Sequence, residues 1–582
     1  MEAADTTYKF SNYAIVLAVL LSIVISMAFK WSYTQNPINF MGGDAKDYYS
    51  TLVSTFITHD LHKQTADEWY LLKTNTGTIN VHPIGVSILL LPFFLIAWFI
   101  AFIFGAALDG YSFPFQASVA LAALTYATVG LVYLKKLFAA HAISDKTGAL
   151  LIILIYFGTN LFHYTLSEAG MSHVYSFSLI SVFLFHSYSF VKGRYNRDLL
   201  LSALVLGLIL LVRPNNILIL LSIFMWFRSW NECNSFFKSL LSNKYFYFAM
   251  LIAASIVFLQ GIVWFVQTDS FFQNTYKRDG FYWFHPQLLN MLFGFNAGFF
   301  IYTPLCFLLL FGMSAVFKEN RFAFYSTAAF LLVLFYFFSS YWGYTYFDGL
   351  GIRVLIDYYA VFALLGAKLF DSLLNRELIY NSVLAGSFLL LAVNLVYTYQ
   401  ANRDILLRAG MNFNKWKYVF LRTDPKYQNC LGGANELVPY AKQLPRMALQ
   451  ADLKLDQAFN FSNSEFGPGL SFDSLGFDTN RISLKLNFGR RELYANSSNK
   501  ALICVSVVDL ASKKNKAYEQ FKLNETPSHT CCEIAEYSYT TNLVGQFTKG
   551  DRLSVYVWNI DKQSFFLENL EVEVYNYNYQ LN

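Results

Sequence analysis

Residues 13–29 read YAIVLAVLLSIVISMAF, an uncharged run that is followed by Lys30 and Trp31. A run of this length and polarity can cross the hydrocarbon core of a bilayer as a helix, because a helix satisfies its own backbone hydrogen bonds there. Lysine and tryptophan directly after such a run are typical of an anchor at the membrane surface. No small-residue cleavage site follows, so we expect a retained first transmembrane helix.

Similar apolar segments recur up to residue 400, where the charge density changes. Residues 1–400 are roughly 10% charged and residues 401–582 roughly 22%, against about 25% in soluble proteins. We therefore expect a polytopic α-helical membrane domain at residues 1–400. The further apolar segments lie at residues 83–105, 113–134, 147–164, 172–190, 199–212, 214–227, 245–266, 298–316, 322–340, 354–374 and 378–400.

The basic loops between these segments predict the orientation, because loops rich in lysine and arginine face the cytoplasm. With a cytoplasmic N-terminus, Lys135 and Lys136 stay inside only if one of the segments 13–29, 83–105 and 113–134 does not cross, and residues 83–105 are the candidate. We interpret that segment, which carries Pro83 and Pro92, as a juxtamembrane or re-entrant helix on the outer face. We expect residues 199–227, split by Arg213 and Pro214, to form two short helices that meet outside. This topology gives 11 spans, with residues 30–112, 165–171, 267–297, 341–353 and everything after 400 outside the cytoplasm.

The tail has a different periodicity. From about residue 451 apolar and polar residues alternate, as in LSVYV at 553–557 and LEVEV at 570–574. Short alternating strands with Gly- and Asn-rich turns predict an all-β, jelly-roll-like sandwich at residues 451–582, joined by a connector at 401–450. We expect the sandwich to position a glycan-bearing acceptor, and the exposed aromatic residues that we propose for this are Tyr539, Trp558 and Tyr577.

The overall composition excludes several classes of protein. With 55% hydrophobic and 14% charged residues, the chain is neither a soluble nor a disordered protein. The net charge is only +5, and the chain has no run of lysine and arginine that could bind a nucleic-acid backbone, so we expect no nucleic-acid partner. The six cysteines match no zinc spacing, and we interpret them as unpaired. The alternative is a disulfide from Cys504 to Cys531 or Cys532 in an oxidising compartment.

Two carboxylates follow the first apolar run in the stretch MGGDAKDYY at residues 41–49. If this stretch is helical, Asp44 and Asp47 lie on one face at the membrane surface. One could then act as a catalytic base while the second acid holds a partner or a substrate hydroxyl. The alternative is a solvated loop, or a helix that is capped by Asp44.

These residues belong to a wider pattern. The stretch GDAKDYY at 43–49, followed by HPIG at 82–85 before an apolar segment, resembles the first outer loop of the GT-C superfamily. These are integral-membrane glycosyltransferases that take sugars from polyprenyl-phosphate or polyprenyl-diphosphate carriers, and they include protein mannosyltransferases and aminoarabinose transferases. Glu168 stands where that family has a second outer-loop acid. YWGYTYFDGLGIR at 341–353 looks like its late motif, which ends in Gly-x-Arg.

The resemblance implies roles for the matching residues. Asp44 would be the base that acts on the acceptor, Glu168 the second outer-loop acid, and Arg353 the contact to the carrier phosphate. Asp47, the second acid of the local pair, is a further catalytic candidate. Where relatives often have a second acid, position 45 is Ala, so a metal bridged by Asp44 and its neighbour is not favoured. We expect no metal site and no certain cofactor.

The chemistry of the transfer calls for the same residue types. Displacing a lipid phosphate from a sugar needs a carboxylate that removes the acceptor proton and a cation that stabilises the leaving phosphate. Arginine suits the second role, because it stays charged and can bind two phosphate oxygens. Arg213 is a second candidate for phosphate binding. The alternatives are an interfacial anchor for Arg353 and a cap of the helix break for Arg213.

Further residues are candidates for substrate binding. Trp283 and His285 lie in loop 267–297, whose charges and aromatic residues suit a substrate lid with platforms for a sugar. His82 and Tyr346 lie in the two loops that carry Asp44 and Arg353. For loop 267–297 the alternative is an aromatic belt at the membrane interface.

The combined prediction is an inverting glycosyltransferase of the plasma (inner) membrane, with its active site and C-terminal domain extracytoplasmic. It would move a sugar from a polyprenyl-phosphate donor in the bilayer to a protein, lipid or glycan acceptor. One alternative is an oligosaccharide ligase that uses a diphosphate donor, and another is a non-catalytic transporter of glycans or lipid-linked sugars. The polar residues gather at one face and do not line a path through the spans, which favours an enzyme.

Overall fold

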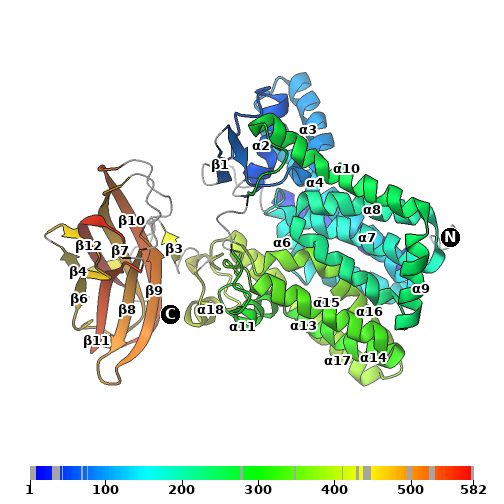
Figure 1. Ribbon diagram of the computed structural model, residues 1–582. Coiled ribbons are helices and arrows are strands. Elements are labelled where there is room, and N and C mark those ends of the chain that lie inside the picture. Colours follow the sequence, from blue (N-terminus) through cyan, green and yellow to red (C-terminus); the bar gives the residue numbers. More distant parts are fainter. Residues whose placement is uncertain are drawn as a thin grey trace. The chain divides into compact units, whose positions relative to one another are not determined.

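The computed structural model describes most of the chain, and its contacts divide the chain into two compact units, Met1–Thr398 and Tyr399–Asn582 (Figure 1). The first unit is helical, and the second consists mainly of β-strands. The described residues are 8–28, 40–41, 44–66, 70–74, 76–275, 280–346, 349–408, 410–427, 432–436, 447–455, 457–494, 501–523, 531–560 and 562–577.

The helices of the first unit follow the apolar segments of the sequence. They are α1 (Lys9–Ser26), α2 (Asp44–Phe56), α3 (Gly85–Phe104), α4 (Phe113–Ala140), α5 (Asp145–Phe157), α6 (Leu161–Leu166), α7 (Ser172–Gly193), α8 (Asn196–Val212), the 3-10 helix η4 (Pro214–Trp226), α9 (Trp230–Leu241), α10 (Lys244–Thr268), α11 (Leu288–Phe293), α12 (Phe299–Tyr302), α13 (Pro304–Leu309), η5 (Leu310–Gly312), α14 (Met313–Glu319), α15 (Arg321–Ser339), η6 (Arg353–Tyr358), α16 (Tyr359–Leu373) and α17 (Glu377–Asn402).

Seven of the described helices are long and apolar enough to cross a membrane: α1, α3, α4, α7, α10, α15 and α17. The unit is therefore a multi-pass membrane domain. The other predicted spans are shorter or interrupted. Residues 298–316, for example, are divided among α12, α13, η5 and α14. Helix α3, which we expected to stay on the outer face, has the length of a span, so the predicted count of 11 spans stays a prediction.

The breaks in the helices have local causes. Helix α8 ends at Val212 because Arg213 has extended backbone angles and Pro214 has no N–H to continue the ladder. Proline also begins α13, directly after Thr303, whose backbone is not helical. Each break interrupts the backbone hydrogen bonds and places a polar side chain, Arg213 or Thr303, at a helix end. One of them, at Arg213, forms part of the site described below.

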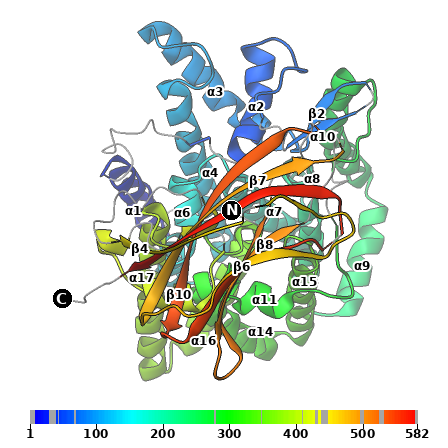
Figure 2. The ribbon, with the colours of Figure 1, turned by 90° about the vertical axis from the view of Figure 1, so that its left-hand side faces the viewer.

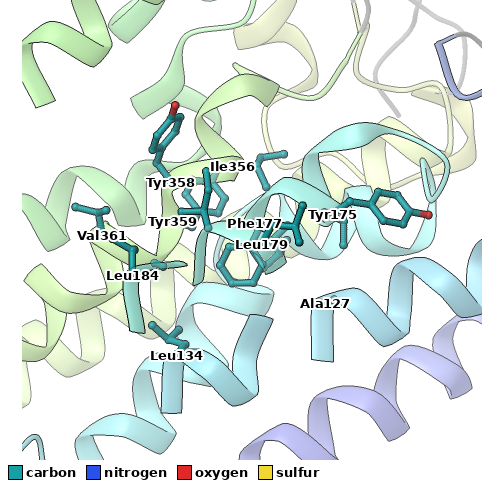
Figure 3. Packing of buried hydrophobic residues seen from close by; sticks show 14 of the residues in the cluster. Ala127, Leu134, Tyr175, Phe177, Leu179, Leu184, Ile356, Tyr358, Tyr359 and Val361 are labelled. Atoms are coloured by element: carbon teal, nitrogen blue, oxygen red, sulfur yellow. The ribbon is translucent and has the colours of Figure 1, made fainter. Parts of the chain in front are cut away.

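Helix α7 lies at the centre of the membrane unit, and nearly all of its residues are buried. In Figure 3 its side chains Phe177 and Leu184 belong to one apolar cluster with Leu134 of α4 and Val361 of α16. Gly130 allows α4 to approach closely, because a Cβ there would lie 2.6 Å from the ring of Phe177. Tight packing of small against large residues is how helices associate in lipid.

A short hairpin, β1 (Leu71–Lys73) with β2 (Thr78–Asn80), fixes the loop between α2 and α3 to the end of α10. The hydroxyl of Thr76 donates to the carbonyl of Thr268 at 2.6 Å. Gln267 donates its side-chain amide to the carbonyl of Leu61 at 3.0 Å. The hairpin is therefore held in place beside α2, on which the candidate base lies.

The second unit contains two antiparallel sheets, which Figure 2 shows from one side. One has the order β3-β10-β7-β12-β4, with β5 also paired to β12, and the other has the order β6-β11-β8-β9. The strands are β3 (Gly432–Glu436), β4 (Met447–Lys454), β5 (Phe459–Asn460), β6 (Phe466–Phe472), β7 (Thr479–Glu492), β8 (Leu502–Asp509), β9 (Lys514–Lys522), β10 (Ile534–Phe547), β11 (Asp551–Trp558) and β12 (Phe565–Tyr577). Residues 401–450 belong to this unit too. They hold α18 (Phe413–Val419) and η7 (Pro425–Tyr427) besides β3.

The two sheets share one apolar core, formed by alternate residues such as Leu486 of β7, Val505 of β8, Val555 of β11 and Val572 of β12. The tail is therefore an all-β domain, as its alternating pattern predicted. In β7, β8, β11 and β12 alternate side chains face this core, as in other two-layer β-domains.

Three expectations about single residues of the tail need correction or qualification. Tyr539 is not exposed: it is buried in the core, and its hydroxyl donates to the carbonyl of Leu523. Trp558 is half-buried and stacks on Phe466 with ring centroids 6.2 Å apart. The side chain of Tyr577 lies outside the described part of the chain.

The alternative of a disulfide is also wrong. Cys504 is buried in β8 and accepts a hydrogen bond from the hydroxyl of Tyr518 at 3.4 Å. Cys531 and Cys532 are exposed, and all three thiols are free. The alternate residues Ile503 and Val505 face the core, so Cys504 lies on the other face of β8, beside Tyr518 of β9.

Candidate active site

Asp44 is the first residue of α2, where the helix dipole favours a carboxylate. Its two oxygens have different partners. Arg353 donates from Nη2 to Oδ2 at 2.8 Å, and Tyr70 donates its hydroxyl to Oδ1 at 3.0 Å. The side chains of Asp44 and Arg353 are 15% and 13% exposed, so the ion pair is largely shielded from solvent.

The protonation of Asp44 reflects a balance between burial and neighbouring charge. Burial raises the pKa of Asp44, but the guanidinium of Arg353, assisted by His82, Tyr70 and Arg213, outweighs it and holds the pKa below its usual value. The pKa of Tyr70 shifts in the opposite direction. Burial and the Asp44 carboxylate raise the pKa of Tyr70, so it remains a hydrogen-bond donor. Asp44 is therefore an ionised carboxylate at neutral pH.

Asp47 lies one turn further along α2 and is fully buried. Its Oδ2 is 3.9 Å from Nε2 of His82, and the imidazole of His82 lies between the rings of Tyr48 and Tyr70, at centroid distances of 4.6 and 4.9 Å. The side chain of Asn80 donates to the backbone carbonyl of Asp47 at 2.8 Å. His82 thus packs against Tyr70, which bonds to Asp44, and Asp47 lies beside His82.

Arg353 reaches Asp44 from a distant part of the chain, 309 residues away. The backbone that carries it is fixed on one side, because Asn160 donates to the carbonyl of Leu350 at 2.6 Å and Tyr359 bonds to Asn160. Gly351 has φ of +69°, a conformation that residues with a Cβ rarely adopt. The loop is thereby shaped so that the Arg353 side chain points at α2.

Glu168 also belongs to this cluster. It is close enough to Arg353 to act electrostatically on the guanidinium, as are Tyr164 and Tyr48. Its Oε1 lies 3.5 Å from Nε2 of the buried His163. The acid that the sequence placed in a separate outer loop therefore meets the same arginine as Asp44.

Arg213 lies at the break between α8 and η4, and it too is close enough to Asp44 to act on it electrostatically. Its Nη1 donates to Oγ of Ser172 at 3.2 Å, and its Nε is 3.4 Å from Oδ2 of Asp357. Asp357 is fully buried and also contacts His173 at 3.0 Å and Asn216 at 2.7 Å. Arg213 is thus a second cation of the site, held from behind by a carboxylate.

Some residues of this site were not predicted. Asp357 is an ionisable residue inside the apolar segment 354–374, a signal that should have identified it, because such residues are rare in spans and usually functional. Asn160, Asn216 and Tyr70 carry no comparable signal in the sequence, since each is an ordinary polar residue near a helix end or in a loop.

The structure does not bring Trp283 and His285 to Asp44 in any described contact. Trp283 packs at the end of α15, where the hydroxyl of Tyr336 donates to its carbonyl at 2.5 Å, and His285 is exposed. A row of rings nevertheless leads inward from Trp283 through Phe281 and Tyr341 to Tyr346, with centroids 4.7, 5.7 and 5.3 Å apart. Tyr346 ends this row close enough to Arg213 to interact with it electrostatically. Residues 276–279 of the same loop lie outside the described part of the chain.

Among the described residues, no group of three or more histidine, cysteine, aspartate and glutamate side chains is placed to hold a metal ion. Around Asp44 the arrangement is that of a carboxylate in contact with an arginine and a tyrosine. It can accept a proton from a hydroxyl group, and the two arginines can bind an anion.

No family model and no curated protein matches the chain. Several solved structures resemble its fold. An archaeal oligosaccharyltransferase from Archaeoglobus fulgidus, in complex with an inhibitory peptide and a dolichol-phosphate, has 13% identity and a TM-score of 0.42, over 71% of this chain and 57% of that chain. Its apo form has 13% identity and a TM-score of 0.41, over 70% and 57%. An arabinosyltransferase from Mycobacterium smegmatis has 12% identity and a TM-score of 0.25, over 77% and 57%.

Two of these structures are of an oligosaccharyltransferase and one is of an arabinosyltransferase. This chain spans little more than half the length of the archaeal enzyme that it resembles. Because the identities and TM-scores are low, we infer the function from the residues of this chain.

Proposed function

We propose that the protein is an inverting membrane glycosyltransferase, which moves a sugar from a polyprenyl-phosphate donor to an acceptor outside the cytoplasm. The observation that carries this proposal is the contact of Asp44 with Arg353, with Arg213 and Glu168 beside it. A carboxylate at the start of a surface helix and two arginines from distant loops meet in one place. The second arginine, Arg213, is held by a carboxylate of its own, Asp357.

The chemistry assigns one step to each group. The acceptor oxygen forms a bond to the anomeric carbon while the bond from that carbon to the phosphate oxygen breaks. Asp44 takes the proton of the acceptor, and Arg353 stabilises the negative charge that grows on the leaving phosphate. Attack from the side opposite to the phosphate inverts the anomeric carbon. The low exposure of Asp44 and Arg353 strengthens both electrostatic interactions.

The position of the basic loops supports an extracytoplasmic site. Helix α7 begins at Ser172, which contacts Arg213, and ends beside Lys192. Helix α8 runs the other way, with Arg197 in its first turn and Arg213 at its end. Because α7 has 22 residues, about 33 Å at 1.5 Å per residue, the site and the basic loops lie at opposite ends of these helices. By the positive-inside rule the site then faces away from the cytoplasm.

The strand order of the tail supports a jelly roll that presents the acceptor. Strand β4 pairs with β12, β6 with β11, β7 with β10 and β8 with β9, so the pairs nest one inside the next. A long antiparallel ribbon that folds over itself gives this nested order, and jelly rolls of this kind include lectin domains. We propose that the tail positions a glycan-bearing acceptor.

A comparison of carrier lipids and surface glycans in cells with and without the protein tests this function. We expect cells that lack it to accumulate one lipid-linked sugar and to lose that sugar from a surface glycan, glycolipid or protein. The wild-type chain should restore both, and Asp44→Asn should restore neither. Restoration by Asp44→Asn would show that Asp44 is not the base, which leaves Asp47 or Glu168 as the base, or a non-catalytic transporter, as the alternatives. Because Arg213 lies near Arg353, the site has two cations, and a diphosphate donor is therefore the second candidate. The mass of the accumulated lipid distinguishes a monophosphate donor from a diphosphate donor.

A further inference from the structure

Both carboxylate oxygens of the candidate base, Asp44, are engaged in hydrogen bonds. Oδ2 of Asp44 accepts from Arg353 and Oδ1 accepts from Tyr70. The arginine that bonds to the base is the residue proposed to bind the donor phosphate. An acceptor hydroxyl that approaches Asp44 in this state must therefore compete with a charge-assisted hydrogen bond at 2.8 Å, which is among the stronger ones in proteins.

The two arginines are held differently. Arg213 is anchored from behind by Asp357, by Ser172 and by the ring of His173, with Nη1 3.4 Å from that ring's nitrogens. Arg353 is held at its backbone by the fixed loop, whereas its guanidinium bonds directly to the base. A phosphate group that enters between them meets one fixed cation and one whose side chain can turn from Asp44 to the phosphate.

We propose that the Asp44–Arg353 ion pair is a lock that the donor opens: the phosphate of the donor draws Arg353 away from Asp44 and so frees the base for the acceptor. This inference rests on the proposed function and adds an order to it, in which the donor binds first and the acceptor second. Without donor, the base stays engaged and no hydroxyl group is activated.

The electrostatics of Asp44 agree with this order. The groups that face it are Arg353, His82, Tyr70 and Arg213, and Asp47 lies one turn away on the same helix. Burial raises the pKa of Asp44 and Arg353 is the largest of the opposing influences. When a phosphate neutralises Arg353, the pKa of Asp44 rises, and a carboxylate whose pKa is nearer to neutral is the stronger base.

Carboxyl labelling of the full-length protein in nanodiscs tests the lock. The protein is treated with a water-soluble carbodiimide and an amine at a series of pH values, and peptide mass spectrometry gives the labelled fraction of Asp44. The midpoint of labelling against pH reports the protonation of Asp44, whereas shielding by a ligand changes only the amplitude. The probes are a polyprenyl monophosphate and, separately, inorganic phosphate, so that the contribution of the lipid chain is distinguished from that of the phosphate group.

We expect the polyprenyl monophosphate to raise the midpoint for Asp44 by about one pH unit or more, which corresponds to a tenfold change in protonation. Asp60, in an exposed loop beside Lys63, is the internal control whose midpoint should not move. In Arg353→Gln the midpoint should be high without any ligand and should rise no further. An unmoved midpoint in the wild type at saturating ligand would overturn the lock. An equal rise of the midpoint in Arg353→Gln would also overturn the lock, because the phosphate would then act on Asp44 directly. The same holds if the midpoint of unliganded Arg353→Gln is no higher than that of the unliganded wild type.

The two proposals can fail separately. Labelling requires no transfer, so a raised midpoint shows that the phosphate draws Arg353 from Asp44, whereas transfer by Asp44→Asn would remove only the role of Asp44 as the base. Conversely, loss of transfer in Asp44→Asn together with an unmoved midpoint leaves the catalytic base in place and removes the lock.

Discussion

A Cβ atom at Gly170 would lie 2.4 Å from the Cβ of Ala45, the residue that follows Asp44. Ala45 is 2% exposed, and the carbonyl of Phe40 lies 3.0 Å from the same point. The position next to the candidate base therefore has room for a methyl group and no more. This contact leaves no space for an acidic side chain directly after Asp44. The other acids of the site come from Asp47 and Glu168.

Ala45→Asp should destabilise the protein and abolish activity. The added carboxylate overpacks a closed contact, which typically costs about 1–3 kcal/mol, and it buries a second negative charge beside Asp44. Thermal unfolding of the purified protein measures the loss of stability. Thr55→Asp, at an exposed position of the same helix, should leave the unfolding temperature within a degree or two. A stable Ala45→Asp variant that gains metal-dependent activity would contradict our account of this position.

Asp44→Asn should abolish sugar transfer and leave the protein folded. The amide keeps the size of the side chain and can still accept a hydrogen bond from Tyr70, but it cannot take the acceptor proton. Loss of a general base typically lowers the rate by about 10² to 10⁴, whereas loss of a helix cap changes stability by about 1 kcal/mol and activity little. Rates of the purified variant, with Asp60→Asn as control, separate the two outcomes. A wild-type rate would move the test to Asp47 and Glu168.

Arg353→Gln should change both donor affinity and the pH profile. Hydrogen bonds to a charged group contribute about 1.5–3 kcal/mol, so the KM for the donor should rise on the order of 10- to 100-fold, and excess donor should restore part of the rate. Asp44 must be ionised to act, so kcat/KM falls as the pH falls through the pKa of Asp44. Arg353 holds that pKa low against burial, so its removal should move the acidic limb to higher pH. An acidic limb at the wild-type position would show that Arg353 does not control Asp44.

Sequence patterns predicted the elements of this site better than the contacts among them. Asp44, Glu168 and Arg353 stand in short motifs, and their loops share one predicted side of the membrane. The bond between Asp44 and Arg353 spans 309 residues and depends on the packing of α2 against the helices, which no local spacing encodes. Asn160, which fixes the Arg353 loop through the carbonyl of Leu350, was not predicted for the same reason.

The error at Tyr539 has a different origin. In β10, the core residues are Tyr539, Leu543 and Phe547. Successive side chains of a strand alternate between its faces, so a shift of one residue reverses every assignment. The register follows from the pairing of β10 with β7, where Tyr539 lies opposite Leu486. The composition of this tyrosine-rich strand does not determine it.

The orientation of the chain can be tested with reporter fusions. Alkaline phosphatase should be active after residue 400 and also after Gly110, because we predict that α3 stays on the outer face. A reporter that is active only in the cytoplasm should be inactive when it is fused at either position. Activity of the cytoplasmic reporter at Gly110 alone would show that α3 crosses, as its length allows. Activity of that reporter after residue 400 would place the tail in the cytoplasm and contradict the proposed extracytoplasmic acceptor.

The tail, residues 399–582, has its own apolar core and should fold when expressed alone. Its circular dichroism should be of β type, and a helical spectrum would refute the fold. Leu486→Ala removes a fully buried side chain, so the free energy of unfolding should fall by about 2–5 kcal/mol. Lys513→Ala, in the exposed turn between β8 and β9, should change it by less than about 0.5 kcal/mol.

The proposed role of the tail is tested separately, with an array of glycans. Trp558 stacks on the exposed ring of Phe466, so the pair offers an aromatic surface of the kind that sugars contact. We expect the isolated tail to bind at least one glycan and Trp558→Ala to lose that binding with an unchanged spectrum. Because Trp558 lies at the end of β11, its truncation leaves the core residues Leu553 and Val555 in place. A tail that folds but binds no glycan would refute the acceptor-positioning role and leave the sandwich and the membrane site unaffected.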